Sequence, residues 1–216
     1  MPSQNAPATP AADAIPRVAY VGVAGGLLLM AFFTLLWASW LFGTVTPAIA
    51  TPIFAAYAVF AIVFVVVAVR VFGSARRAPA IDTDERIGQT TSIGRQFGII
   101  FGIEFVLIGA AGGILSATGN SDYLNPVIAL IVGAHFIPLA RVFERTIDYY
   151  IATWTILFAL LGIALLLFTS TPRDTVWTIV ALAAANGTTA YGVYMLVIAR
   201  RLTRRQAART RGSMMP

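Results

Sequence analysis

The chain has 216 residues, of which 58% are hydrophobic and 11% are charged, and its mean hydropathy is +0.81. Soluble domains contain about 25% charged residues, so this composition excludes a soluble domain and indicates an integral membrane protein. The formal net charge is +6, but the basic residues gather at the ends of apolar segments, so we expect no nucleic-acid partner. Cysteine is absent, which excludes disulfides, thiolate metal sites and a cysteine nucleophile.

The hydropathy pattern predicts an all-α polytopic membrane protein with six transmembrane helices. Each apolar run has about the 20 residues that an α-helix needs to cross a bilayer. The expected spans are 18–42, 51–73, 94–116, 125–145, 150–169 and 175–199. They lie within a transmembrane domain over 17–200, between a disordered tail over 1–16 and a basic tail over 201–216 that continues the last helix. The first run is too long for a cleaved signal, and we expect it to remain as a helix.

The third helix is expected to begin outside the bilayer, near Asp84. Asp84 and Glu85 would place negative charge at its N-terminus, where the helix dipole is positive.

The arginines predict the orientation of the chain. All 15 basic residues are Arg, and they cluster after the second, fourth and sixth spans, whereas the alternate connections hold only Arg173. By the positive-inside rule both termini are cytoplasmic, in a multi-pass protein of the plasma (inner) membrane. The partners expected from this pattern are membrane lipids, with anionic headgroups at the basic C-terminal tail.

Small residues recur at four-residue spacing in three predicted helices: Gly22 and Gly26; Gly94, Gly98 and Gly102; Ala184, Thr188 and Gly192. This spacing lets helix backbones approach closely in a membrane. We expect ordinary packing within the chain, and a homodimer along such a stripe is the alternative. Glu104 lies about 120° around the helix from Gly98, so it points toward a different neighbour.

Two ionisable residues interrupt the apolar runs at similar depth. Glu104 lies nine residues beyond Arg95, about 13.5 Å into the bilayer. His135 lies six residues before Arg141, about 9 Å from the same side. Because the third and fourth spans are joined by a short loop, they should be adjacent and antiparallel. We therefore predict a midplane site formed by Glu104 and His135.

Two further residues are expected to contribute to this site. Asn186 is fourteen residues before Arg200 and is also central. Pro138 should kink the fourth helix and free the carbonyl group of Ala134, beside His135.

Three interpretations of this cluster stay open. The first interpretation is a structural hydrogen bond. The second is the proton-coupled or substrate-binding site of a small transporter, because intramembrane ionisable groups often mark such pathways. An enzyme, haem or metal site has less support, because the chain has one His and lacks H-E-x-x-H and G-x-S-x-G motifs. We predict no catalytic residue, metal or cofactor. The alternative to transport is a non-catalytic accessory subunit of a larger membrane complex.

A second polar patch is expected at the cytoplasmic end of the fourth helix, from Arg141, Glu144, Arg145 and Asp148. Spacings of three and four residues would place their alternating charges on one side of a helix. An ion-paired interfacial cap is the favoured interpretation, and a gate is the alternative.

The segments RQFGIIFGIEFVLIG and IVGAHFIPLARVFERTIDYY resemble a pattern in uncharacterised bacterial six-span inner-membrane proteins. These proteins have an acidic residue in one helix and G-x-H-F-x-P-L-A in the next. The resemblance implies a bacterial plasma-membrane location and no particular activity.

Overall fold

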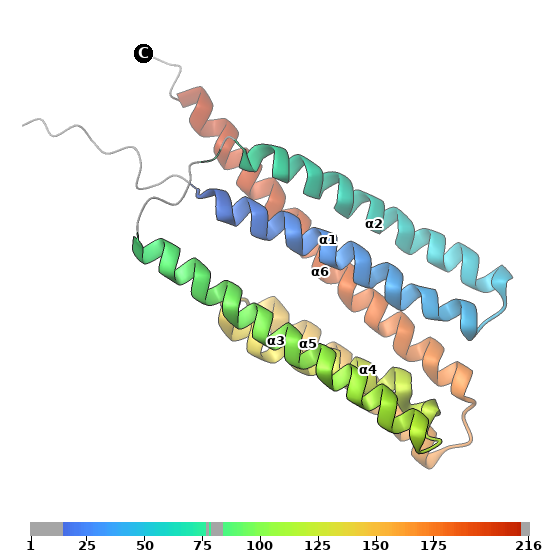
Figure 1. Cartoon of the computed structure of the whole chain (residues 1–216). Helices are drawn as coiled ribbons and strands as arrows, with labels where there is room; N and C mark the ends of the chain where they lie inside the picture. The colour runs from blue at the N-terminus through green and yellow to red at the C-terminus, as the bar shows by residue number, and fades with distance from the viewer. Residues whose placement is uncertain (1–14, 77, 79–83, 213–216) are drawn as a thin grey trace, which may run out of the picture.

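The computed structural model describes residues 15–76, 78 and 84–212, and within them it contains helices and no strands (Figure 1). Six long helices follow one another: α1 (Arg17–Ser39), α2 (Pro47–Ala75), α3 (Asp84–Ala117), α4 (Leu124–Phe143), α5 (Thr146–Phe168) and α6 (Arg173–Gly212). Two short 3-10 helices, η1 (Trp40–Gly43) and η2 (Ser121–Tyr123), follow α1 and precede α4. All six long helices are apolar enough to cross a membrane. The predicted all-α, six-span fold is confirmed.

The helices begin at or near the positions that the sequence predicts. α3 begins at Asp84, as the sequence predicts. α2 begins at Pro47, four residues before the expected start, because proline is well suited to the first turn of a helix. The start of α1 and the end of α6 lie at the same end of the bundle, which we call the Arg-rich end (Figure 1). Residues 1–14 and 213–216 of the predicted tails lie outside the described residues.

α6 is the central helix of the bundle. It packs against α1, α2, α4 and α5, and 61% of its most apolar window is buried. The Thr34 hydroxyl of α1 donates a hydrogen bond of 3.0 Å to Thr188, and Trp154 Nε1 of α5 donates one of 2.9 Å to the carbonyl of Ala183. Such polar contacts contribute about 0.6 kcal/mol each between membrane helices. The frame of α1, α2, α4, α5 and α6 is therefore joined through its central helix.

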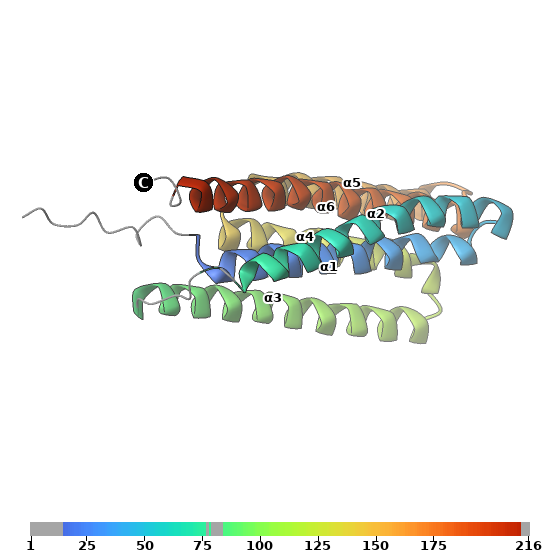
Figure 2. The ribbon, with the colours of Figure 1, turned by 90° about the horizontal axis from the view of Figure 1, so that it is seen from above.

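α3 lies at the edge of this frame. It packs chiefly against α4, only 6% of its most apolar window is buried, and Figure 2 shows it as a separate outer layer. No atom of another helix lies within 4 Å of where a Cβ would stand on Gly94, Gly98 or Gly102. Gly98 and Gly102 are exposed, so the expectation that the stripe packs against a neighbouring helix is wrong at these residues, because α3 turns a different face, with Glu104, toward the bundle.

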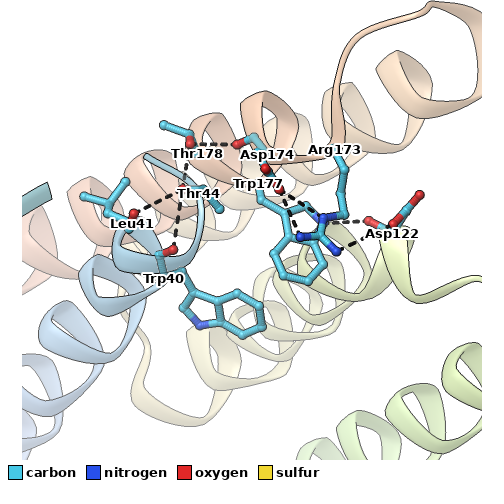
Figure 3. Close-up of polar contacts among 8 residues, drawn as sticks. All are labelled: Trp40, Leu41, Thr44, Asp122, Arg173, Asp174, Trp177 and Thr178. Carbon is cyan, nitrogen blue, oxygen red and sulfur yellow. Dashed lines mark hydrogen bonds and ion pairs between the residues drawn. The ribbon is translucent and has the colours of Figure 1, made fainter. Parts of the chain in front are cut away.

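At the end opposite the Arg-rich end, the start of α6 holds two connections in place (Figure 3). Trp177 Nε1 donates a hydrogen bond of 2.6 Å to the carbonyl of Asp122 in η2, and the Thr178 hydroxyl donates one of 2.8 Å to Thr44 after η1. The guanidinium of Arg173 lies over the Trp177 ring at 4.7 Å. The short turn from α3 into α4 is thus attached to the central helix.

The close packing of α6 gives a first prediction. A Cβ at Gly192 would collide with the ring of Phe64, which is fully buried and has no room to move. We expect Gly192→Ala to lower the free energy of unfolding by about 1–3 kcal/mol through overpacking. Gly98→Ala is the control, because its Cβ meets nothing and alanine favours a helix. Reversible unfolding in detergent measures both variants, and equal stabilities would contradict the packing of α6 on α2.

Candidate functional site

Glu104 and His135 form the centre of the candidate site. Oε1 of Glu104 on α3 lies 3.2 Å from Nδ1 of His135 on α4, and the two side chains are 4% and 9% exposed. The helices are consecutive and antiparallel, so residues at equal depth meet across their interface. The structure thus brings together the two ionisable groups that interrupt the apolar spans.

Aromatic rings fix the orientation of the imidazole. The Phe101 ring of α3 meets His135 edge-on at 5.4 Å, and the Phe136 ring lies 4.3 Å away on the other side. These neighbours supply no hydrogen bond, so the interaction of a charged imidazole with Glu104 is screened less than it would be in water.

The pair borders a cavity of about 330 Å³ among α1, α3, α4 and α6. Both Glu104 and His135 line it. Oε2 of Glu104 and Nδ1 of His135 are both buried, and neither has a partner with hydrogen-bond geometry in the described part of the chain, so the contact of 3.2 Å is a close approach of the two groups. The rest of the lining is mostly apolar, and its glycines and aromatic residues are Gly22, Gly25, Gly26, Gly94, Phe33, Trp37, Phe97, Phe101, Phe136, Phe143 and Tyr191. A carboxyl group with one unsatisfied oxygen thus belongs to the wall of a mostly apolar cavity.

Arg145 and Tyr191 form a second polar group on the cavity wall. Nη1 of Arg145 donates a hydrogen bond of 3.3 Å to the Tyr191 hydroxyl, and the guanidinium lies 5.0 Å from the centre of the Phe143 ring. Tyr191 was not among the predicted site residues. Its position nine residues before Arg200 is a signal that could have found it, since that places its hydroxyl-bearing ring deep in the span.

Asp148, in the first turn of α5, lies behind this second group. It is 1% exposed, and neither carboxylate oxygen has a hydrogen bond of good geometry among the described residues. Its electrostatic neighbours are Tyr191, Arg145 and His135. Asp148 is thus a buried acidic neighbour of Arg145, which lines the cavity, although no ion pair within 4.0 Å joins the two.

The predicted cytoplasmic patch is divided in the structure. α4 ends at Phe143 because Glu144 adopts a left-handed conformation with φ 53°, so the four residues do not share one helix. Glu144 and Arg141 are exposed, whereas Arg145 turns inward and Asp148 is buried. No ion pair within 4.0 Å joins two of these residues in the part of the chain that the structure describes. Arg145 thus lines the cavity and Asp148 is buried, which differs from the expected ion-paired cap at the membrane interface.

The structure places Asn186 and Pro138 away from the cavity. Asn186 accepts a hydrogen bond of 2.9 Å from the Tyr57 hydroxyl of α2 and does not line the cavity. It stands about 200° around α6 from Thr188, which does line the cavity. α4 continues through Pro138, and both this residue and Ala134 are exposed, so the expected polar pocket at the Ala134 carbonyl does not form part of the cavity lining.

The cavity offers few metal ligands. No group of three or more His, Asp or Glu side chains within the described ranges is placed to hold a metal ion. Glu104 and His135 can share a proton or bind one polar group of a ligand.

A double-mutant cycle tests whether Glu104 and His135 interact. We expect the unfolding free energies of Glu104→Ala, His135→Ala and the double variant to give a coupling of about 0.5–3 kcal/mol, as for side chains in contact. The control cycle pairs Glu104→Ala with Asn186→Ala, which should be additive within about 0.5 kcal/mol because the two residues face different helices. Coupling of the same size in both cycles would contradict the site as described.

Comparison of the chain with models of protein families, with curated proteins and with solved structures gave no match.

Proposed function

We propose that this chain binds a small ligand inside the membrane and couples binding to protonation of Glu104, as a proton-coupled transporter or solute-binding protein. The observation that carries the proposal is Glu104, which lines a cavity of about 330 Å³ and whose Oε2 is buried without a hydrogen-bond partner among the described residues. Ligand-binding pockets have volumes of about 300–1,000 Å³ and combine apolar walls with a few polar groups. The cavity has both properties.

The chemistry of the pair supports a role in proton exchange. A carboxylate and an imidazole 3.2 Å apart can pass a proton between them, and histidine changes its charge near neutral pH. A charged residue in the middle of a span costs about 2.5–3.5 kcal/mol on insertion scales. Helix packing alone needs no such residue, since the neutral pair of Thr34 and Thr188 joins α1 to α6 at lower cost.

Filling the cavity should abolish ligand binding and leave the fold intact. A Cβ at Gly25 meets nothing within 4 Å and this residue lines the cavity, so the side chain in Gly25→Leu can occupy the space where a ligand would stand. Gly109→Leu is the matched control, because Gly109 has equally free space but does not line the cavity. Native mass spectrometry of the protein released from nanodiscs of its own membrane lipids measures the bound small molecule.

We expect that molecule in the wild type and in Gly109→Leu, and its loss in Gly25→Leu. Equal retention in both variants, or a cavity that is always empty, would contradict ligand binding at this site.

The accessory-subunit alternative is supported by the outward face of α3. Gly98 and Gly102 are exposed, and nothing lies within 4 Å of where their Cβ atoms would stand. Small residues at this spacing favour helix association in membranes. This alternative predicts a stoichiometric partner after mild detergent extraction, lost in Gly98→Leu and retained in Gly25→Leu. Extraction of the wild type without a partner would contradict it.

A further inference from the structure

We infer that the cavity takes a hydrophobic, monovalent organic cation from the bilayer in exchange for the proton of Glu104. This inference rests on the proposed function and specifies the ligand. It follows from the charges that face the cavity, from the aromatic composition of its walls and from the way the cavity lies between α1 and α3.

The charges favour a cation. The ionisable lining residues are Glu104, His135, Arg145 and Tyr191. Arg145 has the buried Asp148, a residue of opposite formal charge, as an electrostatic neighbour, so the formal charges of these two residues sum to zero. When the imidazole is neutral and Glu104 is ionised, Glu104 adds a negative charge to the cavity wall, and its Oε2 has no partner among the described residues. A buried charge of this kind is stabilised strongly only by an opposite charge, which an organic cation would supply.

The walls suit a cation that carries apolar groups. Phe97, Phe101 and Phe136 line the cavity near Glu104 and His135, and a cation over an aromatic face gains about 0.5–2 kcal/mol. The structure already shows one such contact on this wall, where the guanidinium of Arg145 lies 5.0 Å from the Phe143 ring centre. The same arrangement is available to a ligand.

The position of the cavity indicates access from the lipid. α3 packs chiefly against α4, and the cavity separates it from α1, whose facing wall includes Gly22 and Gly25. The lining on α1 runs from Gly22 to Trp37, about 22 Å along the helix axis. An elongated or bulky apolar ligand can therefore lie between the two helices with its charge beside Glu104.

The exchange is balanced in charge. Protonated Glu104 releases its proton through the adjacent imidazole of His135 to water, the carboxylate forms, and one ligand cation binds it. One positive charge leaves as one arrives, so the site keeps the same net charge in both states. Protonation of Glu104 in turn removes the attraction and releases the cation.

The test compares two ions of the same shape and opposite charge, tetraphenylphosphonium and tetraphenylborate, with the full-length protein in nanodiscs. The amount of ion bound to Glu104→Gln is subtracted from the amount bound to the wild type. This subtraction removes the contribution of ions that partition into the lipid. We expect saturable binding of the phosphonium ion only, with affinity falling by up to about tenfold for each unit of pH decrease, since one proton competes with one cation.

Control variants separate loss of the site from loss of the fold. Gly25→Leu should abolish phosphonium binding, Gly109→Leu should retain it within twofold, and all variants should unfold at temperatures close to that of the wild type. Equal binding of both ions, or phosphonium binding that does not change with pH, would overturn the inference. If phosphonium fails to bind while native mass spectrometry still finds a molecule that Gly25→Leu excludes, the cation inference fails and the proposed function stands.

Discussion

The contact between Glu104 and His135 is the constraint on which the architecture of the site depends. α3 is the least buried of the six helices, and the face that it turns inward carries a carboxylate that the apolar interior would otherwise penalise. Pairing with His135 on α4 offsets part of that penalty and sets the depth at which the two helices meet. Oε2 of Glu104 remains without a partner, so the pair satisfies the carboxylate incompletely. The contact thus attaches α3 to the frame and leaves a carboxylate oxygen of Glu104, a residue that lines the cavity, without a partner.

The five-helix frame is closely packed and α3 is not, and the cavity lies between them. α6 joins α1, α2, α4 and α5 through close contacts. One of them is that of Gly192 with the ring of Phe64, where there is no room for a Cβ. α3 is attached to this frame through α4 and through η2, which Trp177 holds at the end opposite the Arg-rich end. Glycines on α1 and α3 supply no side chains to close the space between these helices. A closely packed frame with one loosely attached helix can admit a ligand without unfolding its core.

Hydropathy was sufficient to predict the six spans, because length and apolarity are what the bilayer demands of a helix. The meeting of Glu104 and His135 could be anticipated from depth and from the short connection between their helices. The direction in which each residue faces around its helix axis was harder to predict. Asn186 has the expected depth but faces Tyr57, and Gly98 and Gly102 of α3 are exposed, because the rotation of each helix depends on all its neighbours. The end of α4 was missed because Glu144, rather than a glycine, adopts the left-handed conformation there.

The chain has a single histidine, which allows a direct test of the claim that Glu104 and His135 share a proton beside the cavity. Labelling with ¹⁵N-histidine gives the signals of one imidazole, whose chemical shifts report its protonation and tautomer. The account predicts that these chemical shifts differ between the wild type and Glu104→Gln, and that they stay the same in Asn186→Ala. Identical imidazole shifts in the wild type and in Glu104→Gln would show that the two groups are independent and would contradict the account.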